Sequence, residues 1–293
     1  MDTFTHTESP SRWVRRLLDA PAGWRVLDAP ARPLHDLAEA VPFGPYRDVL
    51  HGVPLGHPLH PVLVQVPVGC WLSSALLDCV PGGRRASAVL VAAGLAGAVP
   101  AAVAGWVDWA ELDPPRRRTG LVHAAANSTG LVLYAASLWS RLRGHGLRGS
   151  ALGMAGLTAV AAGAALGGHL SYRQAAGPHR ASATLRPTVP EWAALGAVEE
   201  FPPGKPVRRD AGGLSVVVVR EQDGFRVLAE QCGHLSGPLA DGTVVDGCLR
   251  CPWHGSEFRL RDGEVIHGPA TAPQPVFETR VLADHLEARL PGS

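Results

Sequence analysis

The sequence predicts a protein of two parts, an all-α bundle of four transmembrane helices followed by a small all-β antiparallel domain. Three observations support this prediction. Four apolar segments of near-bilayer length come first, a stretch rich in Pro, Ala and Arg follows them, and short strand patterns with Asp-Gly turns fill the remainder. We therefore divide the chain into a basic N-terminal segment (1–50), a transmembrane domain (51–170), a linker (171–195) and a C-terminal β domain (196–293).

Composition sets limits on the function. The net charge is +1 and 18% of the residues are charged, so no strong field favours nucleic acid as a partner. The charges are unevenly distributed, because residues 86–106 contain none, whereas residues 197–291 have the composition of a soluble domain. Five cysteines without regular spacing argue against a disulfide framework and favour a reducing compartment.

The N-terminal segment is rich in proline and contains a short amphipathic pattern. Its apolar face consists of Trp13, Val14, Leu17 and Leu18, and arginines occupy the opposite face. This pattern suits a helix lying on a membrane surface, although a small helix packed on the rest of the protein fits it as well. No secretory signal is visible, because no apolar stretch of signal length follows the pair Arg15-Arg16.

Four apolar segments are near the ~20 residues that a helix needs to cross a bilayer core. They cover residues 61–77, 86–107, 121–139 and 150–168, with breaks rich in Pro, Gly and Arg between them. A buried bundle in a soluble protein is the alternative, and four consecutive segments of this purity disfavour it. An even number of spans leaves both termini on one side, and the arginine bias favours the cytoplasm for that side. We expect a multi-pass protein of the cell membrane, with bilayer lipid as a partner and the C-terminal domain in the cytoplasm.

The C-terminal part changes to a strand pattern. Asp223-Gly224 predicts a hairpin turn between two apolar runs, and further Asp-Gly pairs mark later turns. The expected strands cover residues 214–220, 225–229, 276–282 and 286–290. Short strands at this spacing predict an antiparallel β domain.

Within this domain, two short motifs carry metal-binding side chains. Cys232-Gly-His234 is followed after a strand and a turn by Cys251-Pro-Trp-His254. Two thiolates and two imidazoles, one of each per loop, are the ligands of a Rieske [2Fe–2S] cluster. A zinc site is the alternative, since Cys248 stands at Cys-x2-Cys with Cys251, but zinc sites usually pair cysteines with cysteines and histidines with histidines. We interpret Cys248 as a buried strand residue.

The motifs resemble those of the Rieske ferredoxins, the small electron carriers of aromatic-ring dioxygenase systems. The resemblance covers residues 197–290 and includes two boxes, 232–239 and 251–258, and a proline loop, 268–273. It implies that Cys232, His234, Cys251 and His254 hold the cluster and that Gly237, Gly255 and Ser256 surround it. The first box departs from the family at Ser236, where a glycine is usual.

Two differences from the respiratory Rieske proteins are informative. Those proteins carry an extra disulfide between the loops, at positions that are Gly237 and Trp253 here, and a tyrosine at the position of Phe258. Hydrogen bonds to the cluster raise its potential, so the missing phenol predicts a value toward the low end of roughly −150 to +300 mV. Ser256 remains as a donor. Only His267 and His285 follow the second box, so no mononuclear iron site of an oxygenase is expected.

Residues 50–170 resemble a bacterial four-helix membrane family without an assigned activity. The resemblance rests on the His-Pro-x-His-Pro motif that contains His57 and His60, on Gly105-Trp106-Val107-Asp108, and on His123 with Asn127. It supports the fold more than any function.

Four histidines of this half fall at span ends on one side of the membrane, namely His57, His60, His123 and His169. Intramembrane polar residues are costly and are commonly functional. The histidines therefore suggest haem ligation, a quinone pocket or a bare metal site, while helix capping and interhelical hydrogen bonding explain them equally well.

These features predict a membrane-anchored one-electron carrier, a component of an oxidoreductase system rather than an enzyme by itself. Its redox partner would be a reductase, an oxygenase or a quinone-linked complex. A membrane redox sensor that uses the same cluster, and an anchor that recruits a soluble oxygenase, are the alternatives.

Overall fold

The computed structural model describes residues 10–181 and 192–290, and these residues form two compact units. The helical unit comprises the described part of Met1–Pro42 together with His60–Ala176. The β unit comprises Phe43–Leu59 and the described part of Gly177–Ser293, so the chain passes between the units three times. Each unit is described by itself below.

Two of our expected boundaries differ from this division. The transmembrane domain was expected to begin at residue 51, which lies inside the Phe43–Leu59 segment of the β unit. The expected linker, 171–195, is divided as well, because residues 171–173 complete the last helix, whereas residues 177–181 belong to the β unit. The physical reason is that both segments make their contacts with residues far away in the sequence, which local composition does not reveal. Residues 182–191 of the linker lie outside the described residues.

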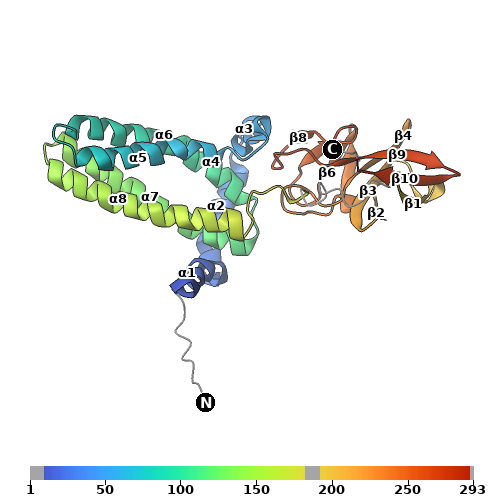
Figure 1. Cartoon of the computed structure of the whole chain (residues 1–293), viewed down its shortest axis with the longest axis horizontal. Coiled ribbons are helices and arrows are strands. Elements are labelled where there is room, and N and C mark those ends of the chain that lie inside the picture. The colour runs from blue at the N-terminus through green and yellow to red at the C-terminus, as the bar shows by residue number, and fades with distance from the viewer. Residues whose placement is uncertain (1–9, 182–191, 291–293) are drawn as a thin grey trace, which may run out of the picture. The chain divides into compact units, whose positions relative to one another are not determined.

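The helical unit contains four helices that are long and apolar enough to cross a membrane (Figure 1). They are α4 with α5 (His60–Leu63 and Gln65–Asp78), α6 (Arg84–Ala110), α7 (Pro114–Leu142), and α8 (Gly146–Gly168), which continues into the π-turn η4 (His169–Arg173). Each helix contains one of the four predicted apolar segments. The predicted fold class, membrane-capable helices followed by a β domain, is therefore confirmed.

Small residues allow these helices to pack closely. A Cβ added at Gly130 of α7 would lie 2.5 Å from Val160 of α8, and one at Gly156 would lie 3.0 Å from the Tyr134 ring. The Tyr134 ring stacks on Trp71 of α5 at 4.2 Å between centroids. Glycine at such positions is the usual means of close helix approach in membranes, where dispersion contacts replace the hydrophobic effect.

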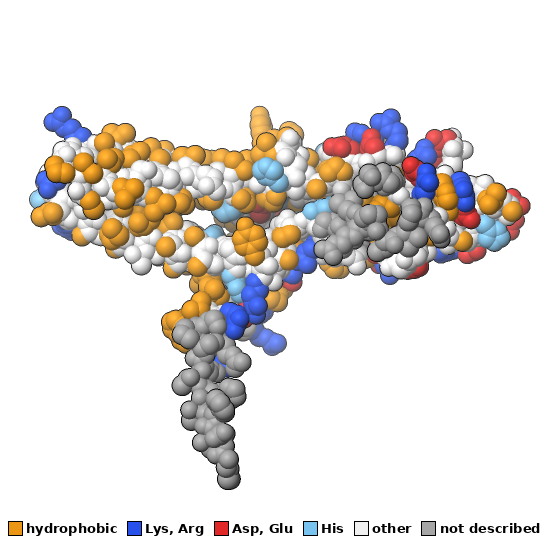
Figure 2. Space-filling view, in the orientation of Figure 1, with side chains coloured by type: hydrophobic (Ala, Val, Ile, Leu, Met, Phe, Trp, Pro, Cys, Tyr) orange, Lys and Arg blue, Asp and Glu red, His pale blue; other side chains and the backbone are white. Residues whose placement is uncertain are grey.

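The outer surface of the bundle is apolar. In the most apolar window of each helix, only 17–28% of the residues are buried. Figure 2 shows the hydrophobic side chains running along the length of these helices, with the charged side chains gathered near their ends. A soluble protein rarely exposes an apolar patch of this extent, so this surface supports burial in lipid.

Two N-terminal helices precede the bundle. Trp13 and Leu17 of α1 (Pro10–Asp19) are exposed, and α2 (Asp28–Ala40) is fastened to α7 by an ion pair of 2.7 Å between Asp28 and Arg118. Short 3₁₀ turns, η1 (Ala20–Gly23) and η2 (Arg25–Leu27), connect the two helices. The first helix thus keeps the free apolar face expected of an interfacial helix, while the second packs on the bundle.

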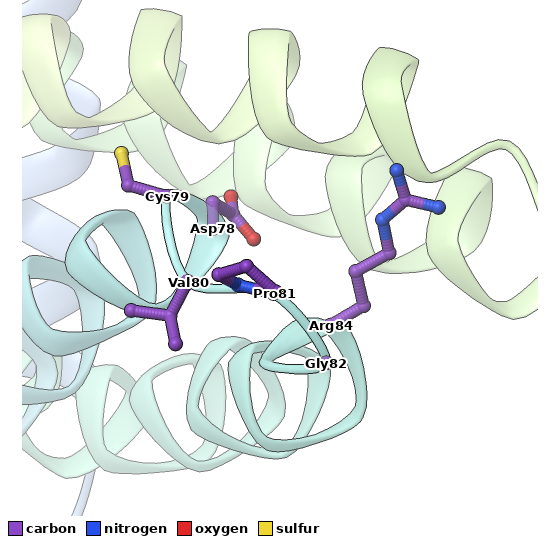
Figure 3. Close-up of a pocket in the computed structure, with 6 residues that line it drawn as sticks. All are labelled: Asp78, Cys79, Val80, Pro81, Gly82 and Arg84. Carbon is purple, nitrogen blue, oxygen red and sulfur yellow. The ribbon is translucent and has the colours of Figure 1, made fainter.

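The turn between α5 and α6 carries a shallow pocket. Its lining consists of Asp78, Cys79, Val80, Pro81, Gly82 and Arg84 (Figure 3). The Asp78 carboxylate is not open for a ligand there, because it pairs with Arg141 of α7 and accepts a hydrogen bond of 2.6 Å from Ser87. We therefore assign the pocket no function.

The β unit contains two antiparallel sheets (Figure 1). The six-stranded sheet has the order β1-β10-β9-β4-β3-β2, and the four-stranded sheet has the order β5-β6-β7-β8. The strands of the first sheet are β1 (Ala193–Ala197), β2 (Val207–Ala211), β3 (Leu214–Glu221), β4 (Gly224–Ala229), β9 (Val276–Leu282) and β10 (His285–Arg289). The second sheet consists of β5 (Thr243–Val245), β6 (Cys248–Arg250), β7 (Glu257–Arg259) and β8 (Val265–His267). The predicted hairpin at Asp223-Gly224 joins β3 to β4, so this prediction is confirmed.

Strand β3 organises the core between the sheets. Its residues Val216–Val219 are all fully buried, because alternate side chains enter two different apolar clusters. One cluster, with Val216 and Val218, also contains Phe201 and Phe277. The other, with Val217 and Val219, includes both motif cysteines, so the candidate site rests directly on the core.

Candidate metal centre

The first motif lies in a tight loop that follows β4. The Cys232 N–H donates to the Gly237 carbonyl at 2.9 Å, and the Ser236 N–H donates back to the Cys232 carbonyl at 2.9 Å. Ser236 adopts φ +64°, a left-handed conformation that is costly for a residue with a Cβ. The serine that departs from the family pattern therefore keeps the backbone shape that a glycine would provide.

The second motif forms an equivalent loop between β6 and β7. The Cys251 N–H donates to the Ser256 carbonyl at 2.8 Å, and the Gly255 N–H donates to the Cys251 carbonyl at 3.2 Å. Gly255 has φ +73°, at the same distance from its cysteine as Ser236 from Cys232. Two loops of matching shape thus present one cysteine and one histidine each.

The four side chains meet as two pairs. Cys232 and Cys251 are buried and share a hydrogen bond between their sulfur atoms. The rings of His234 and His254 lie 5.1 Å apart, nearly perpendicular to each other. No group of three or more His, Cys, Asp or Glu side chains surrounds a single point within residues 10–181 and 192–290. The pairing of thiol with thiol and of imidazole with imidazole fits a two-iron cluster with two ligands per iron.

Two features of the site fit a bound group. The Nδ1 atom of His234 is buried and has no hydrogen-bond partner among the described residues, although buried polar atoms normally have one. Gly237 lies so close to the second loop that an added Cβ would be 2.7 Å from the Cys251 sulfur. The donor atoms and the space around them therefore fit a cluster held by these loops.

Comparison with known families agrees with this geometry. Residues 191–278 match the Rieske [2Fe-2S] domain, and residues 56–180 match a predicted membrane protein family, DUF2231. The anthranilate 1,2-dioxygenase ferredoxin subunit of Burkholderia cepacia is 33% identical over 103 residues, which cover 35% of this chain and 95% of the ferredoxin. The chain belongs to the Rieske [2Fe–2S] family.

Other Rieske proteins match over the same part of the chain. A probable 3-ketosteroid-9-alpha-monooxygenase oxygenase component of Rhodococcus rhodochrous is 40% identical over 91 residues, which cover 30% of this chain and 23% of that protein. Among solved structures, the ferredoxin of carbazole 1,9a-dioxygenase from Nocardioides aromaticivorans IC177 aligns with 22% identity and a TM-score of 0.33, covering 34% of this chain and 98% of that ferredoxin. This chain thus spans nearly all of the ferredoxins and a small part of the oxygenase component.

The surroundings of the Rieske site shift the pKa values of three of its four ligand side chains. Burial, together with the neighbouring His254, His51 and Arg180, lowers the pKa of His234 to about 3, so its imidazole is neutral at physiological pH. The hydrogen bond from Cys232, aided by the backbone N–H groups of Trp253 and His254, lowers the pKa of Cys251 to about 7. The same hydrogen bond to Cys251, together with burial, raises the pKa of the Cys232 thiol. A neutral imidazole and a thiolate are the forms that bind metal.

Polar contacts hold the loops that surround the site. The Gln274 amide donates to the carbonyls of Ala229 and Gln231 at 2.7 Å, and its oxygen accepts from the Gly233 N–H at 3.2 Å. The Gly233 carbonyl in turn accepts from the Arg180 N–H at 2.7 Å, and the His179 ring packs so closely on Gly233 that a Cβ there would collide with it. The glycine of the Cys-Gly-His motif is therefore required by packing.

The expected surrounding residues differ in their roles. Ser256 is fully buried; its Oγ accepts a hydrogen bond of 3.0 Å from the Ala270 N–H, and its hydroxyl also hydrogen-bonds to the Cys232 side chain. Phe258 is fully buried in the core. Trp253, beside His254, is 57% exposed. The second loop thus has a buried side with a hydroxyl donor and an exposed side with an aromatic ring.

The four histidines of the membrane half do not form one group. His57 belongs to the β unit, where its Nδ1 lies 3.2 Å from the Pro58 carbonyl. His169 is buried, with its Nε2 3.2 Å from the Asp19 carboxylate. Only His60 and His123 are brought together, with ring centroids 6.2 Å apart. Helix polarity predicts the end of the span near which each histidine lies. It carries no information about the unit in which each histidine packs.

Both remaining rings have structural partners. The Nδ1–H of His60 donates to the Ala101 carbonyl at 2.8 Å, and the Nδ1–H of His123 donates to the Gly163 carbonyl at 2.7 Å. Asn127 packs on His123 one turn along the helix and donates to its carbonyl at 2.9 Å. These bonds link helices, which is the structural explanation of the histidines, and no finding supports a haem or a quinone.

Sequence reasoning missed several residues near the site. Asp48, His51 and Val53 contact the proline loop, and Gln274 holds the first ligand loop. Gln274 could have been noticed in the sequence, since it is a long polar residue in a loop of otherwise small and apolar residues. The other three carried none, because they lie more than 170 residues before the motifs.

Proposed function

We propose that this protein is a membrane-anchored one-electron carrier that works at the cytoplasmic face of the membrane. Its [2Fe–2S] cluster is held by the side chains of Cys232, His234, Cys251 and His254. The carrying observation is the pairing of two buried thiols and of two imidazoles by loops of matching shape. The bound cluster would supply the reversible one-electron step.

The chain's own residues have three tasks in this proposal. The buried cysteines and the apolar core below them exclude water from one side of the site. Ser256 offers a proton to a cluster sulfur, which raises the potential. The exposed Trp253 and the half-buried His254 form the edge at which a redox partner can approach closely. Aromatic residues are enriched at such contact points between proteins.

The partner class follows from the relatives. The ferredoxin of Burkholderia cepacia is a subunit of a dioxygenase, and the β unit corresponds to nearly its whole length. We therefore propose a reductase as the electron donor and an oxygenase or a quinone-linked complex as the acceptor. The apolar bundle would confine this exchange to the membrane surface. The pair His60 and His123 is left out of the electron path, because hydrogen bonds between helices account for both rings.

Reduction of the purified full-length protein tests this proposal. We expect about two iron atoms per chain, a Rieske electron-resonance signal after dithionite reduction, and uptake of one electron per chain in a titration. The reduced protein should pass this electron rapidly to ferricyanide and should accept it from a flavoprotein ferredoxin reductase with NADH. Cys251→Ser, which replaces one thiolate by a hydroxyl of similar size, is the control and should pass none.

Two results would contradict the proposal. Zinc in place of iron in the wild-type protein would contradict the cluster assignment. A reduced cluster that changes the protein's conformation, as seen by protease resistance, but exchanges no electron with either reagent would favour the redox sensor instead.

A further inference from the structure

The segment Phe43–Leu59 precedes the first membrane-capable helix, yet it belongs to the β unit. Its short helix α3 (Tyr46–His51) ends at Gly52, whose φ of +88° turns the chain into the 3₁₀ turn η3 (Val53–Leu55). A side chain at Gly52 would collide with the backbone of residues 57–59, so the segment is folded tightly on itself. It is therefore a built structure, and its contacts with the β unit show what it does.

Asp48 binds the loop that follows β8. One carboxylate oxygen accepts a hydrogen bond of 2.8 Å from the Gly268 N–H, and the other lies 3.0 Å from the Nδ1 of His267. A carboxylate that accepts from two adjacent residues fixes both the position and the direction of the loop. This loop is the proline loop, residues 268–273, which the resemblance to the Rieske ferredoxins implies would cover the cluster.

Apolar and steric contacts support the same docking. Val53 packs against the apolar cluster that contains Cys232, Cys251 and Ala270. A Cβ added at Gly268 would lie 3.0 Å from the Val53 side chain and 3.5 Å from the His51 ring. His51 is 2% exposed, so its ring is enclosed in the contact. The segment is thus seated on the loop by shape as well as by hydrogen bonds.

The loop connects this contact to the ligands. The Ala270 N–H donates to Ser256 Oγ at 3.0 Å, and the Ser256 carbonyl accepts from the N–H of Cys251 at 2.8 Å. A series of direct contacts therefore runs from Asp48 through the proline loop to Ser256 and a cluster ligand. Loss of the Asp48 contact would therefore loosen the Ser256 hydroxyl, which is placed to donate to the cluster.

The segment lies outside what the Rieske relatives supply. The matched Rieske domain covers residues 191–278, and a match of 103 residues already accounts for 95% of the dioxygenase ferredoxin. We infer that residues 43–59 are a clamp, absent from that ferredoxin, that fixes the cluster-covering loop, with Asp48 as its positioning residue. This inference rests on the proposed cluster site, whose loop and ligands it holds in place.

Three variants of the full-length, cluster-loaded protein test the inference. Asp48→Ala removes both acceptors, whereas Asp48→Asn keeps an oxygen for the Gly268 N–H and loses the charge opposite His267. The matched control is Asp223→Ala, because Asp223 is an exposed carboxylate in the β3–β4 hairpin of the same unit, paired only locally with Arg226. Two readouts are measured, hydrogen exchange of the amides of residues 268–270 and the midpoint potential of the cluster.

In Asp48→Ala, exchange of the Gly268 amide should accelerate about tenfold or more, the equivalent of one lost hydrogen bond, and the Ala270 amide should follow. The midpoint potential should fall, because Ser256 is held less firmly. Asp48→Asn should show a smaller effect on Gly268, and Asp223→Ala should show none. The clamp would be contradicted if the wild type and the three variants showed the same amide exchange at residues 268–270 and the same midpoint potential.

The two hypotheses fail in different ways. Failure of the clamp leaves the wild-type Rieske signal intact and the exchange unchanged by Asp48→Ala. Failure of the proposed function removes the Rieske signal from the wild type, while the exchange comparison still decides whether Asp48 holds the loop.

Discussion

At the scale of single residues, the site depends on conformations that few side chains allow. Ser236 and Gly255 both adopt left-handed backbone conformations at matching positions of the two ligand loops. Gly233 and Gly237 are required for a different reason, because a Cβ on either one would press on His179 or on the Cys251 sulfur. The residues around the ligands therefore fix the loop shape before any metal binds, which is the pre-organisation that a precise metal site needs.

The ligand assignment predicts opposite results for substitutions at His254 and at Cys248, which lie close together in the sequence. His254→Ala removes one of the two paired imidazoles and should abolish the Rieske electron-resonance signal, since no other histidine ring in the described residues is paired with His234. Cys248→Ala should leave the signal unchanged, because Cys248 is a buried residue of β6 that pairs with Val245 and Arg259 along the sheets.

Iron content and the resonance signal of both variants check this prediction. A full signal in His254→Ala would contradict the ligand set, and loss of iron from Cys248→Ala would restore the zinc-like alternative.

At the scale of elements, the helices are joined at one end by a buried ionic network. Arg141 of α7 makes two contacts with the Asp78 carboxylate at the end of α5 and donates to Ser87 of α6 at 2.9 Å. The two charged side chains are only 4% and 11% exposed. Such a pair stabilises little relative to apolar residues, but removal of one partner leaves a buried charge without compensation.

Asp78→Asn should therefore lower the free energy of unfolding of the helical unit by about 3 kcal/mol, because it leaves the Arg141 charge buried. The double variant Asp78→Asn with Arg141→Gln should recover part of this loss. The control Asp113→Asn removes an ion pair with Arg116 that is more exposed than the Asp78–Arg141 pair and keeps the helix cap, so it should cost less than about 1 kcal/mol.

Unfolding of the purified variants in the same detergent, followed by circular dichroism, gives this comparison. Equal losses in Asp78→Asn and Asp113→Asn would show that the network is not buried in the membrane-embedded protein.

At the scale of the whole molecule, if all four membrane-capable helices cross the bilayer, the α5–α6 and α7–α8 turns lie at the membrane face opposite the start of α4 and the end of α8. The arginine bias of the sequence predicts that the residues after α8 enter the cytoplasm. Cys79 is exposed in the α5–α6 turn, and Tyr172 is 92% exposed just after α8. These two positions report on opposite ends of the bundle.

A membrane-impermeant maleimide is added to cells whose cell membrane is intact and whose outer layers let the reagent through. It should label Cys79. Cys79→Ser should remove the label. A Cys79→Ser protein that also carries Tyr172→Cys should be labelled only after the cell membrane is lysed. The reverse pattern would place the β unit outside the cytoplasm and would contradict the proposed site of action.

Several features of the chain could be predicted from the sequence, because they depend on neighbouring residues. A membrane crossing needs about 20 apolar residues in succession, so the four spans are visible as composition. The hairpin at Asp223-Gly224 is local, and the cluster ligands are recognised because one cysteine and one histidine share each short loop. The sequence therefore determined the order of the elements, the two-part architecture and the chemistry of the site.

Only the tertiary structure decided which distant segments meet. Asp48 reaches His267 across 219 positions, and nothing near either residue signals the other. His57 and His60, three positions apart, belong to different compact units, and their spacing in the sequence does not signal this division. The physical reason is that periodicity and spacing describe local backbone geometry, whereas long-range contacts depend on the path of the whole chain and on the packing of its side chains.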